Sequence, residues 1–214
     1  MSNPPPLLDA SAYSPWKVRA FLHYWFARVG SMGAYQMQVV ATGWLVYELT
    51  GSALDLGLVG LVQFLPRVAL TLWAGALADR HDRRRIAMLC MLAQLAACAA
   101  LAAGAAAHAL SRVTILALVG GIGAARAFEM PAMQSLLPRL VCTHQLPRAL
   151  AMSSAAMQTA IVGGPALGGL IFLAGAPVVY AVAGAAFLAA ALLMFTLPAP
   201  TDASATVSHA DQSL

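Results

Sequence analysis

Six long apolar runs, separated by short polar connections, dominate the pattern along the chain. Each run is long enough for a helix to cross a bilayer, which takes about 20 mostly apolar residues. The runs are unbroken and rich in alanine and leucine, and they lack the short alternating segments of a membrane β-barrel. The pattern predicts six transmembrane helices, at about residues 24–49, 54–78, 86–107, 113–136, 150–174 and 177–197.

Composition and the two chain ends set the limits of this bundle. The chain of 214 residues is 61% hydrophobic and 9% charged, whereas a soluble domain carries about 25% charged residues. Too few polar side chains exist to cover a soluble globule, so lipid must surround the spans. The stretches 1–19 and 199–214 are polar and patternless, which predicts disordered cytoplasmic segments on either side of a six-helix transmembrane bundle at 20–198.

Positive charge gathers on one side of the predicted membrane. That side holds eight Lys and Arg residues, and the other side holds one, Arg112. By the positive-inside rule, this places both chain ends in the cytoplasm of a multi-pass protein of the cell inner (plasma) membrane. The eight residues are Lys17, Arg19, Arg80, Arg83, Arg84, Arg85, Arg139 and Arg148.

The residue types that carry chemistry exclude several classes of function. The three cysteines have no spacing typical of a metal site or a disulfide framework, so no metal and no cofactor is expected. The arginine-rich runs are too brief for a nucleic-acid surface. An intramembrane serine protease would need a histidine within a span, but the histidines at 23, 108 and 144 lie outside the spans. We therefore do not expect an enzyme.

Polar residues inside the spans predict a polar interior. Arg28, Ser31 and Gln38 share one face of the first span, and Gln63 and Arg67 form a similar stripe in the second. A buried arginine costs about 2.5–3.5 kcal/mol at a helix centre, so each needs a partner or water. The candidate cavity residues are Arg28, Gln38, Gln63 and Arg67, with structural hydrogen bonding between helices as the alternative role.

The fourth span carries two candidate charge partners, Arg126 and Glu129, at i, i+3 spacing. They either neutralise each other, or Arg126 pairs with Asp79 at the end of the second span. The third and sixth spans offer little polarity beyond Gln94 and Tyr180. We therefore expect these two spans to be outer helices that face lipid.

Small residues and prolines indicate how the spans pack. Small residues at four-residue spacing let helix backbones approach closely, and Gly163–Gly169 in the fifth span reads GGPALGG. Pro66 and Pro165 should kink the second and fifth spans. Each proline lies in the second helix of a group of three. This favours an all-α polytopic membrane fold, with six transmembrane helices in two three-helix repeats.

The stretch Gly75–Arg85, GALADRHDRRR, concentrates charge between the second and third spans. Asp79 falls at a helix C-terminus, where the helix dipole disfavours an acid, so it needs a cation. Asp82 suits the N-cap of the third span. Residues 83–85, all arginine, are expected mainly to hold the loop in the cytoplasm.

This stretch resembles the signature loop of the major facilitator superfamily of transporters. Asp82 departs from the general motif, which has glycine there. The resemblance implies that Asp79 braces the two halves of a transporter on the cytoplasmic side and releases that contact during the cycle. The matching positions of this signature-loop gate are Gly75, Leu77, Asp79, Arg80, Arg83 and Arg84.

The fifth span carries a second resemblance. Its segment AIVGGPALGG is similar to a glycine–proline motif of proton-coupled exporters in this superfamily, with Ala160 where the leading glycine is expected. Residues 16–198 as a whole resemble the efflux branch that includes the enterobactin exporter. The matching residues of the span-five motif are Gly164, Pro165, Gly168 and Gly169.

The resemblance also implies an architecture. Superfamily members have twelve helices in two six-helix halves around one substrate path, and this chain matches the N-terminal half. The implied function is proton-coupled export of a small organic molecule, siderophore- or drug-like. A second half would come from a separate chain, a missing C-terminal half or a second copy. The alternative is a six-helix membrane protein that does not transport, such as a truncated remnant or an assembly partner.

Overall fold

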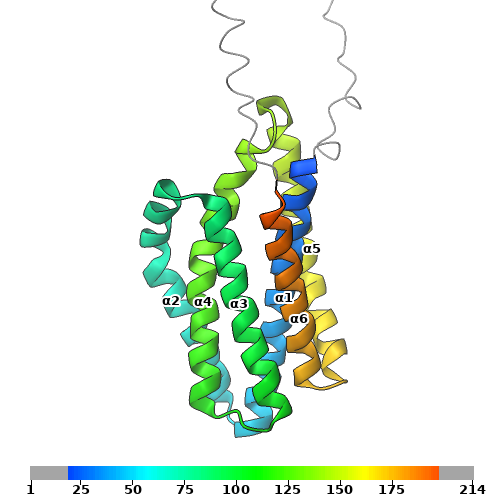
Figure 1. The fold of residues 1–214 in the computed structure, drawn as a ribbon. Helices are drawn as coiled ribbons and strands as arrows, with labels where there is room; N and C mark the ends of the chain where they lie inside the picture. The colour runs from blue at the N-terminus through cyan, green and yellow to red at the C-terminus, as the bar shows by residue number, and fades with distance from the viewer. Residues whose placement is uncertain (1–18, 198–214) are drawn as a thin grey trace, which may run out of the picture.

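A computed structural model describes residues 19–197, apart from the side chains of residue 72 and residues 74–80. The described part is all helical and has no strand, which confirms the predicted class (Figure 1). The predicted disordered segments lie outside it, except Arg19, which begins the first helix. The helices are α1 (Arg19–Thr50), α2 (Ala53–Arg80), α3 (Arg83–Ala106), α4 (Arg112–Leu136), η2 (Leu137–Arg139), η3 (Thr143–Gln145), α5 (Leu146–Phe172) and α6 (Ala176–Phe195).

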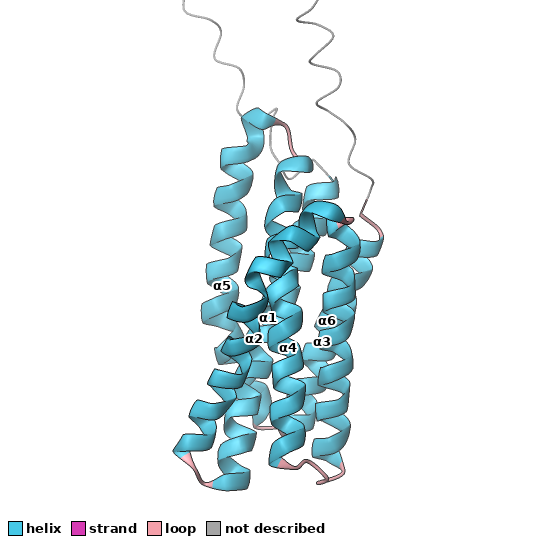
Figure 2. Ribbon diagram, turned by 90° about the vertical axis from the view of Figure 1, so that its left-hand side faces the viewer, coloured by secondary structure: helices cyan, strands magenta, loops and turns pink. Residues whose placement is uncertain are grey.

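The six α-helices run antiparallel to their chain neighbours. The start of α1, the end of α6 and the α2–α3 and α4–α5 connections lie at one end of the bundle, which we call the basic end (Figures 1 and 2). Within the described residues, five helices, α2 to α6, are long and apolar enough to cross a membrane, against the six spans predicted. The polar residues of α1 keep its hydropathy lower, although its 32 residues are ample in length.

Side chains mark several helix starts. The Asp82 carboxylate accepts a hydrogen bond from the backbone N–H of Arg84 at 2.9 Å, which confirms Asp82 as the N-cap of α3. Ser111 caps α4 in the same way. Pro66 and Pro165 lie inside continuous helices, so the kinks expected there stay predictions.

The positions of α3 and α6 in the bundle differ from the prediction, which made both of them outer, lipid-facing helices. Both helices contact each other extensively, and α6 also packs along α1. In the α6 span 44% of residues are buried, against 17% in the α2 span. Gln94 of α3 is fully buried, so one side of α3 faces the interior. The most exposed spans are α2 and α5.

Glycines let two helix pairs approach at backbone distance. A Cβ on Gly123 of α4 would collide with the backbone of Gln63 in α2. A Cβ on Gly168 of α5 would lie 2.9 Å from the Cα atom of Met37 in α1. These approaches are those that small-residue motifs permit. The fifth-span motif therefore faces α1 through part of its residues.

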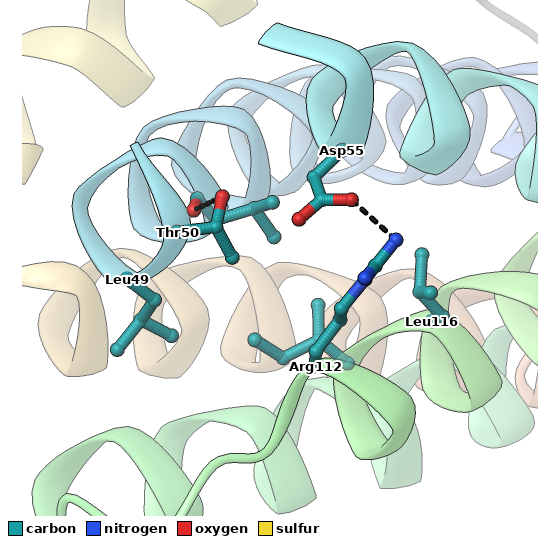
Figure 3. Close-up of a pocket in the computed structure, with 7 residues that line it drawn as sticks. Leu49, Thr50, Asp55, Arg112 and Leu116 are labelled. Carbon is teal, nitrogen blue, oxygen red and sulfur yellow. Dashed lines mark hydrogen bonds and ion pairs between the residues drawn. The ribbon is translucent and has the colours of Figure 1, made fainter. Parts of the chain in front are cut away.

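Arg112, at the end of the bundle opposite the basic end, is paired with Asp55. The buried carboxylate of Asp55 forms an ion pair with Arg112, which joins the starts of α2 and α4 (Figure 3). The pair lines a small hollow together with apolar residues such as Leu49 and Leu116. An acid at a helix N-terminus is also favoured by the helix dipole. The lone arginine of that side is thus charge-compensated.

Candidate functional site: a buried charged cluster

A carboxylate and a guanidinium are buried together in α4. Arg126 and Glu129 form an ion pair at 2.8 Å, and their side chains are 6% and 3% exposed. The structure thus contains the i, i+3 pairing expected as one of the two alternatives. Two buried charges are tolerated only when paired and hydrogen-bonded, because removing them from water is expensive.

Two further helices complete the polar partners of Glu129. Ser31 of α1 donates a hydrogen bond to one carboxylate oxygen, and Gln94 of α3 donates to the other at 2.5 Å. The Arg126 guanidinium also donates to the Ser31 hydroxyl at 3.0 Å. It lies 4.6 Å from the centroid of the Tyr35 ring, a cation–π distance. Three helices therefore meet at one carboxylate.

Sequence reasoning did not find Gln94 as a member of this cluster. The sequence predicts an outer, lipid-facing helix here, in which Gln94 is a single polar residue. Its position in the middle of α3 was the available signal, because an intramembrane polar side chain generally has a partner. The partner, Glu129, lies 35 residues away along the chain.

A second arginine lies beside the cluster and is held differently. Arg28 of α1 donates to the hydroxyl of Tyr24 at 2.6 Å and to the sulfur of Met157 in α5 at 3.5 Å. Tyr24 in turn donates to the backbone carbonyl of Met133 at 3.0 Å. Within the described part of the chain, the Arg28 guanidinium forms no ion pair with a carboxylate.

Methionines line the small cavity that both arginines reach. The cavity measures about 10 Å³ and lies between α1, α4 and α5, so its free space is about that of one water molecule. A thioether is a weak acceptor, yet Arg126 donates to Met32 at 2.7 Å. The lining residues are Arg28, Met32, Arg126, Glu129, Met130, Met133 and Met157.

The other candidate cavity residues lie elsewhere. Gln38 is buried and donates to Thr42, whose hydroxyl contacts Tyr180 of α6. Gln63 is buried against α4 and accepts a hydrogen bond from Tyr35 at 3.4 Å. Arg67 is exposed on α2. The structure thus brings Arg28 to the small cavity but not the other three residues.

The signature loop is described in part. The side chains of Gly75, Leu77, Asp79 and Arg80 lie outside the described residues. Arg83 donates to the backbone carbonyl of Ser135 in α4 at 3.0 Å. Arg84 donates to the carbonyls of Met194, at 2.6 Å, and Phe195 in α6. These two arginines therefore join the start of α3 to the ends of α4 and α6. This contact is additional to the expected role of holding the loop in the cytoplasm.

The span-five motif divides into two faces. Gly164 and Gly168 are buried against α1, where an added Cβ on Gly164 would lie 2.6 Å from the Cβ of Gln36. An added Cβ on Gly169 would meet nothing within 4 Å. Pro165 sits within the same helix. Two of the four motif residues thus make the helix contact.

A larger groove lies between α1 and α2. It measures about 430 Å³ and is lined by Val40, Gly43, Trp44, Tyr47 and Leu56. Its walls are almost entirely apolar, and the charged cluster is not part of it. The groove therefore offers apolar contact without the chemistry of the small cavity.

Comparison with known proteins decides the family. The model of the transmembrane secretion effector family, within the major facilitator superfamily, matches residues 10–208. The chain belongs to this family. It is therefore a multi-pass membrane protein of the major facilitator superfamily, and its family supports a transporter rather than an enzyme.

Several relatives of this family member are efflux proteins or transporters of bacteria. It is 31% identical over 169 residues to the multidrug efflux pump Tap of Mycolicibacterium fortuitum, covering 75% of this chain and 41% of the relative. It is 28% identical over 162 residues to macrolide efflux protein A of Streptococcus pyogenes, covering 75% and 39%. It is 27% identical over 152 residues to the staphyloferrin A transporter of Staphylococcus aureus, covering 71% and 36%. The chain thus spans about two fifths of the length of these relatives.

The charged cluster is the chemically richest interior site that the structure describes in this family member. It combines an acid, two arginines and hydrogen-bond partners from α1, α3 and α4. Ionisable groups within membrane spans are costly, so they mark ion or substrate pathways more often than packing. The cluster can hold a proton, an anion or both.

Proposed function

We propose that this chain forms one six-helix half of a proton-coupled exporter of small organic molecules in the plasma membrane. The observation that carries the proposal is the buried Arg126–Glu129 pair of α4, with partners from two further helices, α1 and α3. The relatives act on a drug class, on multiple drugs and on a siderophore by name. We therefore propose siderophore- or drug-like substrates, and cytoplasmic chain ends from the distribution of arginines.

Glu129 is the proposed proton carrier. When its carboxylate takes a proton, the attraction to Arg126 is lost and an oxygen that accepted a hydrogen bond becomes a donor. The hydrogen bonds from Ser31 of α1 and Gln94 of α3 to this carboxylate of α4 are then weakened. Protonation would thereby loosen the junction of three helices. That is the coupling an exporter needs between proton entry and movement of its helices.

Glu129→Gln tests the proton coupling. Glutamine has the shape of a protonated glutamate, but it leaves Arg126 buried without its counter-charge, so the membrane abundance of the variant is measured beside its transport. We expect proton-driven efflux to fall to the level of cells that lack the chain. Substrate exchange across proteoliposomes without a proton gradient should persist. The measurement is efflux of a fluorescent drug in cells and exchange of the same drug in vesicles.

The control for this variant is Glu48→Gln. Glu48 is an exposed carboxylate near the C-terminal end of α1. The control should leave both efflux and exchange at wild-type levels. Unchanged proton-driven efflux in Glu129→Gln would exclude Glu129 as the proton carrier. Loss of both efflux and exchange would indicate a structural role instead.

We also infer that α1–α3 and α4–α6 are two repeats. The most extensive helix contacts support this, because they correspond to one another when each helix is exchanged for the one three places along the chain. The α1–α5 contact then corresponds to α4–α2, the α1–α6 contact to α4–α3, and α3–α6 to itself. Such internal symmetry is common in transporters.

A second six-helix half is proposed to complete the substrate path. It would come from a separate chain, from a C-terminal half or from a second copy of this chain. The exposed helices α2 and α5 support this, because they carry polar groups such as Arg67 and Gln158 among exposed apolar residues. We propose that Arg67 contributes to the polar lining of that path, while the buried Gln38 and Gln63 take the alternative role of structural hydrogen bonding. Efflux by the chain alone and with a co-expressed second half tests this directly.

Asp79 is proposed as the cytoplasmic brace of the signature loop. Asp79→Asn should abolish efflux and leave membrane abundance unchanged, because the amide keeps the size of the side chain but loses its charge. Efflux and quantitative immunoblots of membranes measure the two quantities. Wild-type efflux in this variant would remove Asp79 from the gate.

A further inference from the structure

We propose that the small cavity between α1, α4 and α5 binds a monoanionic, largely apolar organic molecule, with Arg28 as its charge partner. This inference rests on the proposed function, because it names the substrate class of the proposed exporter.

The cavity carries an unbalanced positive charge. Two arginines and one glutamate line it, and Glu129 is already paired with Arg126 at 2.8 Å. Arg28 has no carboxylate within ion-pair distance in the described part of the chain. A cation inside a membrane span is unfavourable unless a counter-charge or water accompanies it. A ligand with one negative charge would neutralise the cavity.

Arg28 also has hydrogen-bond capacity to spare. Its Nε atom is buried and contacts no acceptor among the described residues. One Nη atom donates to the Tyr24 hydroxyl, and the other has only the Met157 sulfur at 3.5 Å. Because a thioether is a weak acceptor, a carboxylate or sulfonate oxygen would be a far better partner for that donor. Tyr24 therefore holds the guanidinium in place, and the guanidinium's remaining N–H groups can donate to an anion.

The lining selects an apolar body for that anion. Four of the seven lining residues are methionines, contributed by α1, α4 and α5. Methionine side chains are unbranched and polarizable, and they adapt to ligands of different shape. The cavity has about 10 Å³ of free space in this structure, so a ligand must displace these side chains. Flexible methionines can move at lower cost than branched or aromatic side chains.

An inorganic anion would satisfy Arg28 but would gain nothing from the methionines. A cationic drug would gain from the methionines but would meet the uncompensated charge of Arg28. The combination of one free positive charge and a thioether lining therefore favours an organic anion over both. The preference is testable with two ligands that share a shape and differ in charge.

The experiment measures binding of 2-naphthoate and its neutral analogue 2-naphthamide by isothermal titration calorimetry. The full chain is reconstituted in phosphatidylcholine nanodiscs, which contain no anionic lipid, and empty nanodiscs correct for partitioning. We expect naphthoate to bind the wild-type chain at least about tenfold more tightly than naphthamide, as one charge-assisted hydrogen bond would give. Arg28→Gln should remove this difference and leave naphthamide binding unchanged.

Two variants control for folding and for general charge. Arg28→Lys keeps the positive charge and should keep a preference for naphthoate. Arg148→Gln removes an exposed arginine at the start of α5, the helix that carries Met157, and should bind both ligands as the wild type does. Each variant is compared only after size-exclusion chromatography shows a monodisperse chain.

Equal binding of the two ligands by the wild type would overturn the proposal. So would an unchanged preference in Arg28→Gln, or displacement of naphthoate by chloride at an equal concentration. The result is independent of transport, because no second half and no proton gradient is needed. Anion binding without efflux would contradict the proposed function alone, while efflux without anion preference would contradict this inference alone.

Discussion

Arg126→Met is expected to destabilise the helix bundle by about 3–5 kcal/mol, because it leaves the Glu129 carboxylate buried without its cation. Both side chains are almost fully buried, so water cannot replace the lost partner. Ser31 and Gln94 would still donate to the carboxylate, but neutral donors offset only part of the lost charge attraction. The measurement is equilibrium unfolding in mixed micelles with a rising fraction of sodium dodecyl sulfate.

The double variant Arg126→Met/Glu129→Gln distinguishes the loss of the ion pair from the cost of leaving one buried charge unpaired. It removes both charges and keeps an acceptor for Ser31 and Gln94, so we expect it to recover most of the stability lost in the single variant. The coupling energy between the two positions then measures the ion pair. Additive effects of the two substitutions would show that the pair contributes no coupling in the folded bundle.

Gly123→Ala is expected to cost about 1–3 kcal/mol, as overpacking of a well-packed interior does. The added Cβ would meet the backbone of Gln63, and backbone atoms cannot rotate away as a side chain can. The helices α2 and α4 must then separate. The same unfolding titration measures the loss, and cysteine cross-linking between α2 and α4 would report the separation.

Gly121→Ala is the matched control on the same helix. An added Cβ there meets nothing within 4 Å, so the variant should be neutral or slightly stabilising, since alanine is the better helix former. Gly168 and Gly169 form an equivalent pair on α5, with Met37 close to the first and open space beside the second. If Gly123→Ala and Gly121→Ala had equal stability, the close approach of α2 and α4 would be wrong.

The helices themselves could be predicted closely from the sequence. A span must be long and apolar to lie in lipid, and this local requirement needs no knowledge of the neighbours. The largest shift is at the start of α1, which begins at Arg19 rather than Tyr24. The N-cap at Asp82 was equally predictable, since the carboxylate bonds to a backbone N–H two residues later.

The candidate site was predictable only where its members lie close along the chain. Arg126 and Glu129 are three residues apart on one helix, so their pairing was one of two local alternatives. The sequence places Gln94 on a lipid-facing helix, and it predicts only topology and the signature-loop gate as roles for the arginines of the loop. Their actual partners, Glu129 and the ends of α4 and α6, lie on other helices.

The sequence by itself determined the all-helical class, the approximate bounds of the helices, the basic end of the bundle and the residues that cannot lie in lipid without a partner. The tertiary structure alone decided which partners they have. Hydropathy is a property of each segment, whereas the choice between Glu129 and a loop aspartate for Arg126 depends on how six helices are arranged around one another. The same arrangement left Arg28 beside four methionines, with no carboxylate among the described side chains to balance it.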